Sequence, residues 1–138
     1  MNEILIDRDK ALELLRAKIA GNEEYVDPFG TTGSSCQYTP DPEMYSGVDK
    51  NYTAVYIDYP GCLIGQICHD LGATLDQLRT MDTLGTVPVV VEEGEFPFSI
   101  TNSAAEVFFV AQKAQDQGKP WGDALRDAET EYARIEDE

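Results

Sequence analysis

The stretch YPGCLIGQICHDLG, residues 59–72, has the end residues of a helix and apolar side chains along one side. Pro60 suits the first turn of a helix, where no backbone N–H is needed, and Gly72 suits the position just after the last turn. Five apolar side chains between them fall on one stripe at helical spacing: Leu63, Ile64, Ile67, Cys68 and Leu71. We therefore predict a core helix over 61–71, with Cys68 on its buried side.

The same stretch contains two of the three cysteines and the only histidine of the chain. In a helix, Cys62 and His69 would lie on one face but about 10 Å apart, so they could not touch. A zinc site needs four convergent ligands, usually in close pairs, and Cys36 as a third ligand still leaves the set incomplete. We predict no metal site and no cofactor.

Cys62 is a candidate reactive thiol, because the dipole of a helix favours a thiolate in its first turn. The distance to His69 leaves this cysteine without a base, and a strongly acidic chain favours the protonated thiol. We therefore prefer the interpretation that Cys62 packs as a small, half-buried apolar residue, and we predict no catalytic residue. A thiol-dependent enzyme at Cys62 stays open as an alternative.

Four other segments have helical signals. An apolar face and a terminal glycine predict a helix over 8–20. A short helix is expected to begin at Thr74, which has the spacing of a capping box with Gln77. Two longer helices, over 101–118 and 120–138, each have an apolar stripe. We expect this final pair to pack on the core helix.

Three segments have the composition of β-strands: 34–39, 53–59 and 87–92. Apolar and polar side chains alternate in 53–59, as in a half-buried strand, and we expect it to pair with 34–39 across the intervening loop. Pro88 limits the β-branched run at 87–92 to an edge strand or an extended crossover. The sequence thus predicts a single domain, 1–138, of the α+β class: mainly helical (about five helices), with a small two- or three-stranded antiparallel sheet.

The formal charge of the chain is −16, from 26 acidic and 10 basic residues. Such a surface repels phosphate backbones and anionic lipid headgroups, so we expect no direct nucleic-acid binding and no membrane attachment. No apolar run is long enough to span a bilayer, and three cysteines are too few to staple a domain of this size. We expect a soluble, cytoplasmic protein with a basic protein partner. A homodimer stays open, because the adjacent Phe108 and Phe109 cannot both face one core.

Two acidic clusters are candidate surfaces for such a partner. In the last helix Asp123, Asp127 and Glu131 recur at every fourth position, which places three like charges in a row. Rows of carboxylates about 6 Å apart can imitate DNA phosphates, so DNA mimicry is one form that the binding could take. A solvated helix face is the simpler interpretation of this row. The second cluster lies in the loop after 87–92 and consists of Glu92, Glu93 and Glu95.

Two segments together resemble a known group of proteins: PGCLIGQICHDLG, residues 60–72, and AQKAQDQGKPWGDALRDAE, residues 111–129. They are similar to segments of small acidic hypothetical proteins of actinobacteria and their phages. In these proteins a cysteine-containing helix ending in Leu-Gly precedes a Gln-Asp-x-Gly-x-Pro-Trp junction between two helices. The group has no assigned activity, so no catalytic residue is carried over. The resemblance implies a phage-encoded accessory protein of the bacterial or phage-infected host cytosol.

The junction itself has a structural interpretation. Gly118 can end one helix in the left-handed conformation, Pro120 can start the next, and Trp121 can cover the corner. Gln112 and Gln115 could instead line a ligand pocket under Trp121.

For function, we predict a non-enzymatic, acidic accessory protein that acts by binding a basic host or regulatory protein. Two alternatives from other classes stay open. One is a small-ligand binding or sequestering protein that uses the 29–38 loop, the tyrosines and the Trp121 corner. The other is the thiol-dependent enzyme at Cys62.

Overall fold

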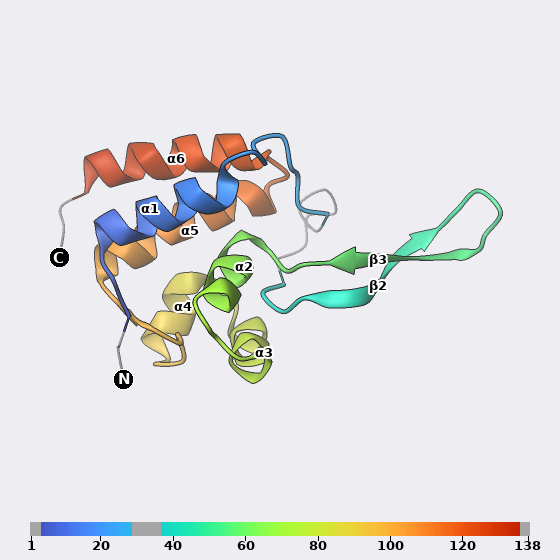
Figure 1. The fold of residues 1–138 in the computed structure, drawn as a ribbon, viewed down its shortest axis with the longest axis horizontal. Helices are drawn as coiled ribbons and strands as arrows, with labels where there is room; N and C mark the ends of the chain where they lie inside the picture. The colour runs from blue at the N-terminus through green and yellow to red at the C-terminus, as the bar shows by residue number, and fades with distance from the viewer. Residues whose placement is uncertain (1–3, 29–36, 136–138) are drawn as a thin grey trace.

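The computed structural model describes residues 4–28 and 37–135, and within them six helices and two small sheets are found. The elements in chain order are β1 (Leu5–Ile6), α1 (Arg8–Ile19), β2 (Asp41–Val48), β3 (Ala54–Tyr59), α2 (Leu63–Asp70), α3 (Leu75–Leu84), α4 (Val87–Glu92), β4 (Ser99–Ile100), α5 (Asn102–Asp116) and α6 (Trp121–Arg134). Figure 1 shows α1, α5 and α6 side by side, the shorter helices α2, α3 and α4 next to them, and the β2–β3 hairpin projecting away. The predicted α+β, mainly helical class is confirmed.

Helices α1, α5 and α6 pack against one another and form one layer of the body. The carboxylate of Asp7 accepts a hydrogen bond of 2.8 Å from the N–H of Lys10 and so caps α1, and Thr101 caps α5 in the same way. Buried alanines let these helices approach closely: Ala11, Ala104, Ala111, Ala124 and Ala128. The final pair packs on the helix at 61–71 only in part, through contacts between α5 and α2. Its main partner is α1, which has 12 residues against the eight of α2 and runs alongside both α5 and α6.

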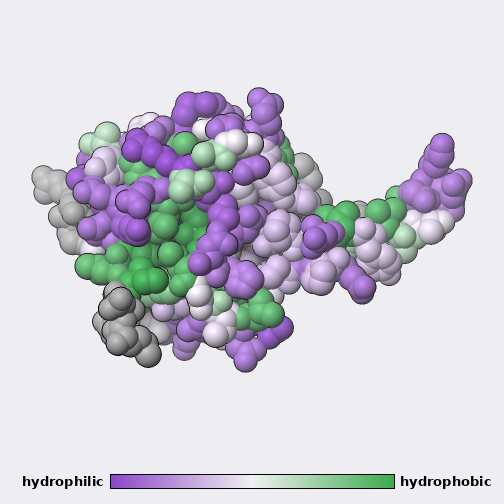
Figure 2. All heavy atoms as spheres, in the orientation of Figure 1, coloured by the Kyte–Doolittle hydropathy of each residue, from purple (hydrophilic) through white to green (hydrophobic). Residues whose placement is uncertain are grey.

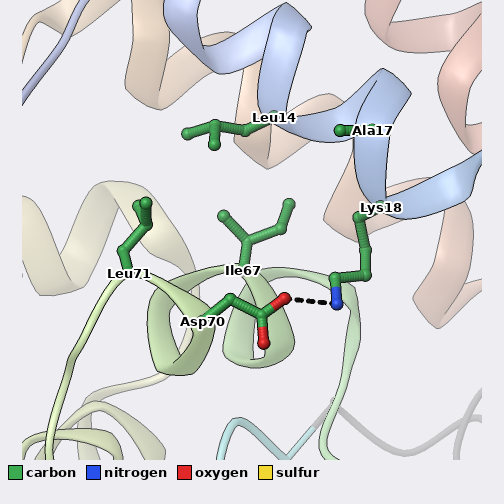
Figure 3. Close-up of a pocket in the computed structure, with 6 residues that line it drawn as sticks. All are labelled: Leu14, Ala17, Lys18, Ile67, Asp70 and Leu71. Atoms are coloured by element: carbon green, nitrogen blue, oxygen red, sulfur yellow. Dashed lines mark ion pairs between the residues drawn. The ribbon is translucent and has the colours of Figure 1, made fainter.

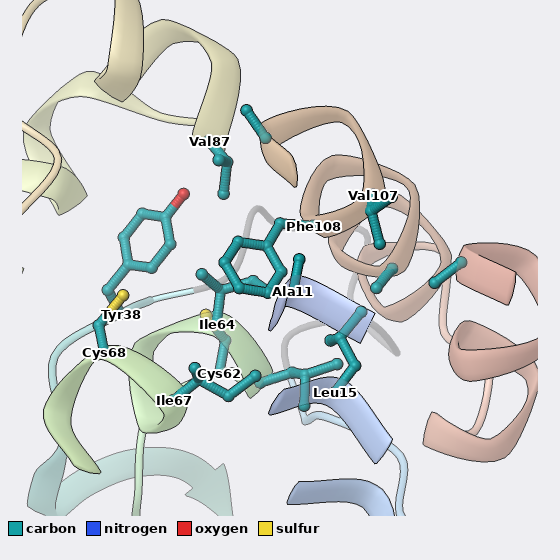
Figure 4. Close-up of a cluster of buried hydrophobic side chains, with 14 of the residues drawn as sticks. Ala11, Leu15, Tyr38, Cys62, Ile64, Ile67, Cys68, Val87, Val107 and Phe108 are labelled. Atoms are coloured by element: carbon teal, nitrogen blue, oxygen red, sulfur yellow. The ribbon is translucent and has the colours of Figure 1, made fainter. Parts of the chain in front are cut away.

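Helix α2 is the core helix expected over 61–71, and it spans Leu63–Asp70. Cys62 takes the N-cap position rather than the first turn, and Gly72 lies just beyond the end with a φ of +108°. The buried side chains of this helix include Leu63, Ile64, Ile67 and Cys68. In Figure 4, Ile64 and Ile67 lie in one apolar cluster with Leu15 of α1 and Phe108 of α5. The helix therefore connects the two groups of helices.

Helix α3 begins with the predicted capping box. The side chain of Thr74 accepts a hydrogen bond of 3.1 Å from the N–H of Gln77, and the side chain of Gln77 accepts one of 2.8 Å from the N–H of Thr74. The helix then buries Leu78 and Met81 against the core.

Helix α4 corrects the prediction of an edge strand over 87–92, because these residues are helical. Pro88 lies in the first turn, where a missing N–H costs nothing, and Val87 and Val90 are buried one turn apart. The N–H of Val87 donates a hydrogen bond of 3.0 Å to Oε1 of Gln112 in α5, which fixes the start of the helix. A β-branched composition favours a strand only weakly, and here burial decides the conformation.

The antiparallel sheet contains one predicted strand and one that was not predicted. β3 lies within the predicted segment 53–59, but its partner is β2, and the described part of the predicted strand 34–39, residues 37–39, does not pair with it. Residues 34–36 lie outside the described part of the chain, and 37–39 form no strand. A turn of only five residues connects β2 to β3. Its closure costs less chain entropy than pairing across the whole 40s segment, which accounts for the observed hairpin.

A second, parallel pair joins β1 to β4 with Leu5 opposite Ser99 and Ile6 opposite Ile100. Two residues a strand are too few for any periodic signal, so the sequence did not reveal this pair. Within residues 4–28 and 37–135, no helix combines the length and the apolar character that crossing a membrane requires.

Candidate functional site: the hairpin arm

The β2–β3 hairpin, residues 41–59, is here named the hairpin arm, and it projects from the helical body (Figure 1). Eight large apolar or aromatic side chains are exposed in the described residues, and five of them belong to the arm: Tyr45, Val48, Tyr52, Val55 and Tyr56. Figure 2 shows apolar residues along the middle of the arm and hydrophilic residues at its tip. Most of the exposed large apolar side chains of the described residues thus belong to a hairpin that the body does not cover.

One face of the arm carries a tyrosine pair. Tyr45 is directly opposite Tyr56 in the register, and their ring centroids lie 5.9 Å apart at an interplanar angle of 66°. Val48 is opposite Ala54, two positions before Tyr56, so side-chain alternation places it on the same face. The side chain of Asp58, two positions after Tyr56, also lies there. We name these residues, Tyr45, Val48, Ala54, Tyr56 and Asp58, the tyrosine face.

The turn at the end of the arm is held by one aspartate. The carboxylate of Asp49 accepts hydrogen bonds from the N–H groups of Asn51 (2.8 Å) and Thr53 (3.0 Å). Tyr52 has a φ of +61°, in the left-handed region, and its side chain is 87% exposed. An aspartate that binds nearby N–H groups in this way is typical of an ordered tight turn.

The base of the arm is attached to the body on both strands. After β3, the fully buried Tyr59 donates a hydrogen bond of 2.7 Å to the carboxylate of the buried Asp27. Before β2, the carboxylate of Asp82 in α3 accepts bonds of 2.6 Å from the N–H of Tyr38 and from the hydroxyl of Thr39. Both ends of the arm are therefore fixed, which orients it relative to the helices.

The backbone of Tyr38 packs directly against α2 at Gly65, which has no side chain to prevent the contact. A Cβ at Gly65 would lie 2.2 Å from the backbone oxygen of Tyr38. The Tyr38 ring enters the core, where its hydroxyl donates to the backbone oxygen of Gly85 and accepts from Nε2 of Gln112, both at 2.6 Å. Figure 4 shows this ring lying between α2 and Val87 of α4.

The acidic row predicted on the last helix lies on α6, but its charges are paired within the chain. Three ion pairs involve the row: Asp123 with Arg126, Asp127 with Lys119, and Glu131 with Arg134. Glu131 is also buried, and the hydrogen bond from Arg134 lowers the pKa of its carboxyl group. The row therefore offers a partner less net charge than the sequence suggested.

The second acidic cluster is open to solvent, since Glu92, Glu93 and Glu95 are all exposed at the end of α4. None of the ion pairs found in the described residues involves them. Beside them lies a polar groove of about 310 Å³, lined by Asp76, Gln77, Thr80, Gly94, Glu95, Phe96 and Pro97. Glu95 belongs to both the acidic cluster and the lining of this groove.

The glutamines and the tryptophan predicted as a pocket lining are instead packed in the core. Oε1 of Gln115 accepts hydrogen bonds from the N–H of Leu63 (2.9 Å) and from the Trp121 indole (3.2 Å). The ring of Tyr25 covers Trp121 edge-to-face with centroids 4.6 Å apart, and burial is the main cause that raises the pKa of Tyr25. Gln112 likewise accepts a hydrogen bond from the N–H of Val87 and donates one to the hydroxyl of Tyr38. The side chains of both glutamines are therefore bonded within the core.

Both described cysteines are fully buried. Cys62 donates its backbone N–H to the backbone oxygen of Gln37 at 2.8 Å, and burial raises the pKa of Cys68 to about 12. His69 is exposed in the last turn of α2. In residues 4–28 and 37–135, no three or more histidine, cysteine, aspartate or glutamate side chains are placed to hold a metal ion. Cys36 lies outside those residues.

A small pocket of about 170 Å³ lies between α1 and α2 (Figure 3). Its lining is Leu14, Ala17, Lys18, Ile67, Asp70 and Leu71, and an ion pair joins Lys18 to Asp70 across its rim. A volume of this size is below the range of ordinary ligand sites, so the pocket does not favour the small-ligand alternative.

A comparison with protein-family models, with curated proteins and with solved structures finds no match to this chain. The sequence reasoning missed the hairpin arm as a site. A usable signal was present in 53–59, because large side chains occur on both faces of this strand. Val55 and Ile57 lie on one face and Tyr56 on the other, which is unusual for a strand with one solvated face.

Proposed function

We propose that this chain is a non-enzymatic binding protein whose hairpin arm attaches to a basic region of another protein. The observation that carries the proposal is the arm itself: five large side chains are exposed on an ordered hairpin that is fixed at its base but not covered by the body. Exposed patches of this kind mark interaction sites in globular proteins. A hairpin also exposes its side chains with little loss of conformational entropy on binding.

The charge of the arm supports a basic partner. Residues 41–59 contain four carboxylates, Asp41, Glu43, Asp49 and Asp58, against the single Lys50. The whole chain is at −16, which speeds encounter with positively charged surfaces and opposes binding to nucleic acid. The resemblance to actinobacterial and phage proteins supports an accessory role in the cytosol of a host cell.

Two alternatives, and DNA mimicry as a form of partner binding, have weaker support. A thiol enzyme would need solvent access at Cys62, whose side chain is fully buried. A small-ligand protein would need the Trp121 corner, which Tyr25 occupies. DNA mimicry by the α6 row would need unpaired carboxylates, whereas the row is engaged with Lys119, Arg126 and Arg134.

The test compares the natural chain with a variant in which residues 45–56 are replaced by Asn-Gly. Met44 and Ile57 are directly opposed in the register, so this turn can close a shortened hairpin between them. The deleted segment contains one acidic and one basic residue, Asp49 and Lys50, so the formal charge stays at −16. Non-specific attraction is thereby held constant while the arm is removed.

The probe is a fluorescein-labelled peptide rich in arginine and lysine, and its binding is measured by anisotropy at low and at moderate salt. We expect the shortened arm to weaken binding about tenfold or more, by loss of several contacts worth roughly 0.5–1 kcal/mol each. The control is Asp123→Asn with Asp127→Asn, which changes the net charge by two units on α6 and should have a smaller effect. Equal binding by the natural and shortened chains would overturn the proposal.

A further inference from the structure

The tyrosine face is the part of the hairpin arm with the most specific chemistry. The two rings are exposed at 58% for Tyr45 and 61% for Tyr56, so aromatic surface is open to a partner on both. They meet at 66° with centroids 5.9 Å apart, which makes an angled aromatic corner rather than a flat patch. Its neighbours on the same face are the exposed Val48 and Asp58.

Resting on the proposed function, we propose that the tyrosine face is a docking site for an arginine side chain in an extended basic segment of the partner. A guanidinium is planar and weakly hydrated, so it can stack on an aromatic ring and still donate hydrogen bonds at its edge. On this face, Tyr45 and Tyr56 supply the ring surface, Asp58 supplies a carboxylate as acceptor, and Val48 contacts the aliphatic part of the side chain.

The chain already contains one contact of this kind. The guanidinium carbon of Arg8 lies 4.4 Å from the ring centroid of Tyr132, and the same guanidinium donates to the backbone oxygens of Tyr132 and Ile135. Stacking on a tyrosine is thus compatible with hydrogen bonding by the same arginine. On the arm, Lys50 in the turn is the only basic residue of the segment 41–59, so a cation for the tyrosine face would come from a partner.

Charge complementarity favours this occupant over a second copy of the chain. Two arms that met through their tyrosine faces would bring together two Asp58 carboxylates on chains that each carry −16. Like charges placed opposite one another oppose association, whereas an arginine peptide reduces the same repulsion. A homodimer through the tyrosine face is the alternative that the experiment also tests.

The experiment uses the full chain and two labelled peptides in which a basic residue alternates with valine. The basic residue is arginine in one peptide and lysine in the other. We expect the arginine peptide to bind about fivefold more tightly than the lysine peptide, because ring stacking favours the guanidinium. Tyr45→Leu with Tyr56→Leu keeps apolar bulk but removes both rings, and should abolish the preference. The matched control is Tyr52→Leu, which removes a tyrosine that is 87% exposed at the tip and should leave the preference intact.

The outcomes separate the two proposals. If both peptides bind through the arm with equal affinity, the arginine site is overturned while the proposed function survives. If neither peptide binds the natural chain more tightly than it binds the shortened arm, both are overturned. Sedimentation of the natural chain tests for the remaining outcome, a homodimer. If the natural chain self-associates and the variant with Tyr45→Leu and Tyr56→Leu does not, the tyrosine face binds a second copy and the arginine site is overturned.

Discussion

Replacing Gly65 by alanine sets two physical effects of opposite sign against each other. Gly65 is inside α2, where alanine is favoured over glycine by about 1 kcal/mol. The structure nevertheless places a new Cβ 2.2 Å from the oxygen, 2.6 Å from Cα and 2.7 Å from the carbonyl carbon of Tyr38. All three are backbone atoms, so no side-chain rotation can relieve the contact.

The Tyr38 segment would have to move by about 1 Å to restore ordinary van der Waals separation. Its N–H is held by Asp82 at 2.6 Å and its hydroxyl by Gly85 and Gln112, also at 2.6 Å, so the movement strains these three bonds. Overpacking costs about 1–3 kcal/mol, and each weakened hydrogen bond adds about 1 kcal/mol. After the gain in helix propensity of about 1 kcal/mol, we expect a net loss of about 3–5 kcal/mol in the free energy of unfolding.

The assay is urea unfolding followed by circular dichroism. His69→Ala, at an exposed position of the same helix, is the control, and we expect it to change stability by less than about 0.5 kcal/mol. A Gly65→Ala variant as stable as the natural chain, or more stable, would refute the close approach of Tyr38 to α2. It would also refute the anchoring of the arm at that point.

Three further predictions concern buried side chains. Burial raises the pKa of Cys68 to about 12 from 9.0, so the folded protein holds this proton more tightly than the unfolded chain. The resulting stability is fully present below pH 9.0 and is lost as the pH rises toward about 12. The unfolding free energy of Cys68→Ala should therefore fall less steeply at alkaline pH, by at most about 1.4 kcal/mol per pH unit. An equally steep fall for the variant would contradict this. Cys62 is fully buried, so iodoacetamide should label it in the folded protein no faster than it labels a model thiol, and rapid labelling would revive the thiol-enzyme alternative. Gln112→Leu removes the acceptor of the Val87 N–H and a donor to Tyr38, and should cost about 1–3 kcal/mol in urea unfolding, whereas an unchanged midpoint would argue against this network.

The sequence predicted those elements whose signal is contained in their own residues. The apolar stripe of α2, its terminal Gly72 and the capping box of Thr74 and Gln77 are local, and the structure confirms them. Pro60 was expected in the first turn of α2, but it lies before the helix, which begins at Leu63. The segment 87–92 failed because its composition favours a strand, while its conformation depends on a proline in the first turn and on Gln112 from a distant helix.

The candidate site was harder to predict, because large side chains on both faces of 53–59 do not by themselves indicate that both faces are exposed. Alternation in 53–59 was interpreted as one buried face, whereas Tyr59 is buried and Val55 is 37% exposed. Alternation distinguishes the two faces of a strand but does not say whether either face has a core to contact. The ion pairs of the α6 row could have been predicted from the sequence. Arg126 and Arg134 each lie three positions after an acidic residue of the row, a spacing that permits ion pairs on a helix.

The parallel pairing of β1 with β4 has a consequence for how the chain folds during synthesis. Leu5 pairs with Ser99, more than 90 positions later, and Arg8 of α1 bonds to backbone oxygens beyond position 130. Helix α1 is thus synthesised well before the segments that it contacts, and contacts of such high sequence separation slow folding. We expect a nascent chain that stops before α5 to expose the apolar side of α1 and to be a substrate for chaperones until α5 and α6 emerge.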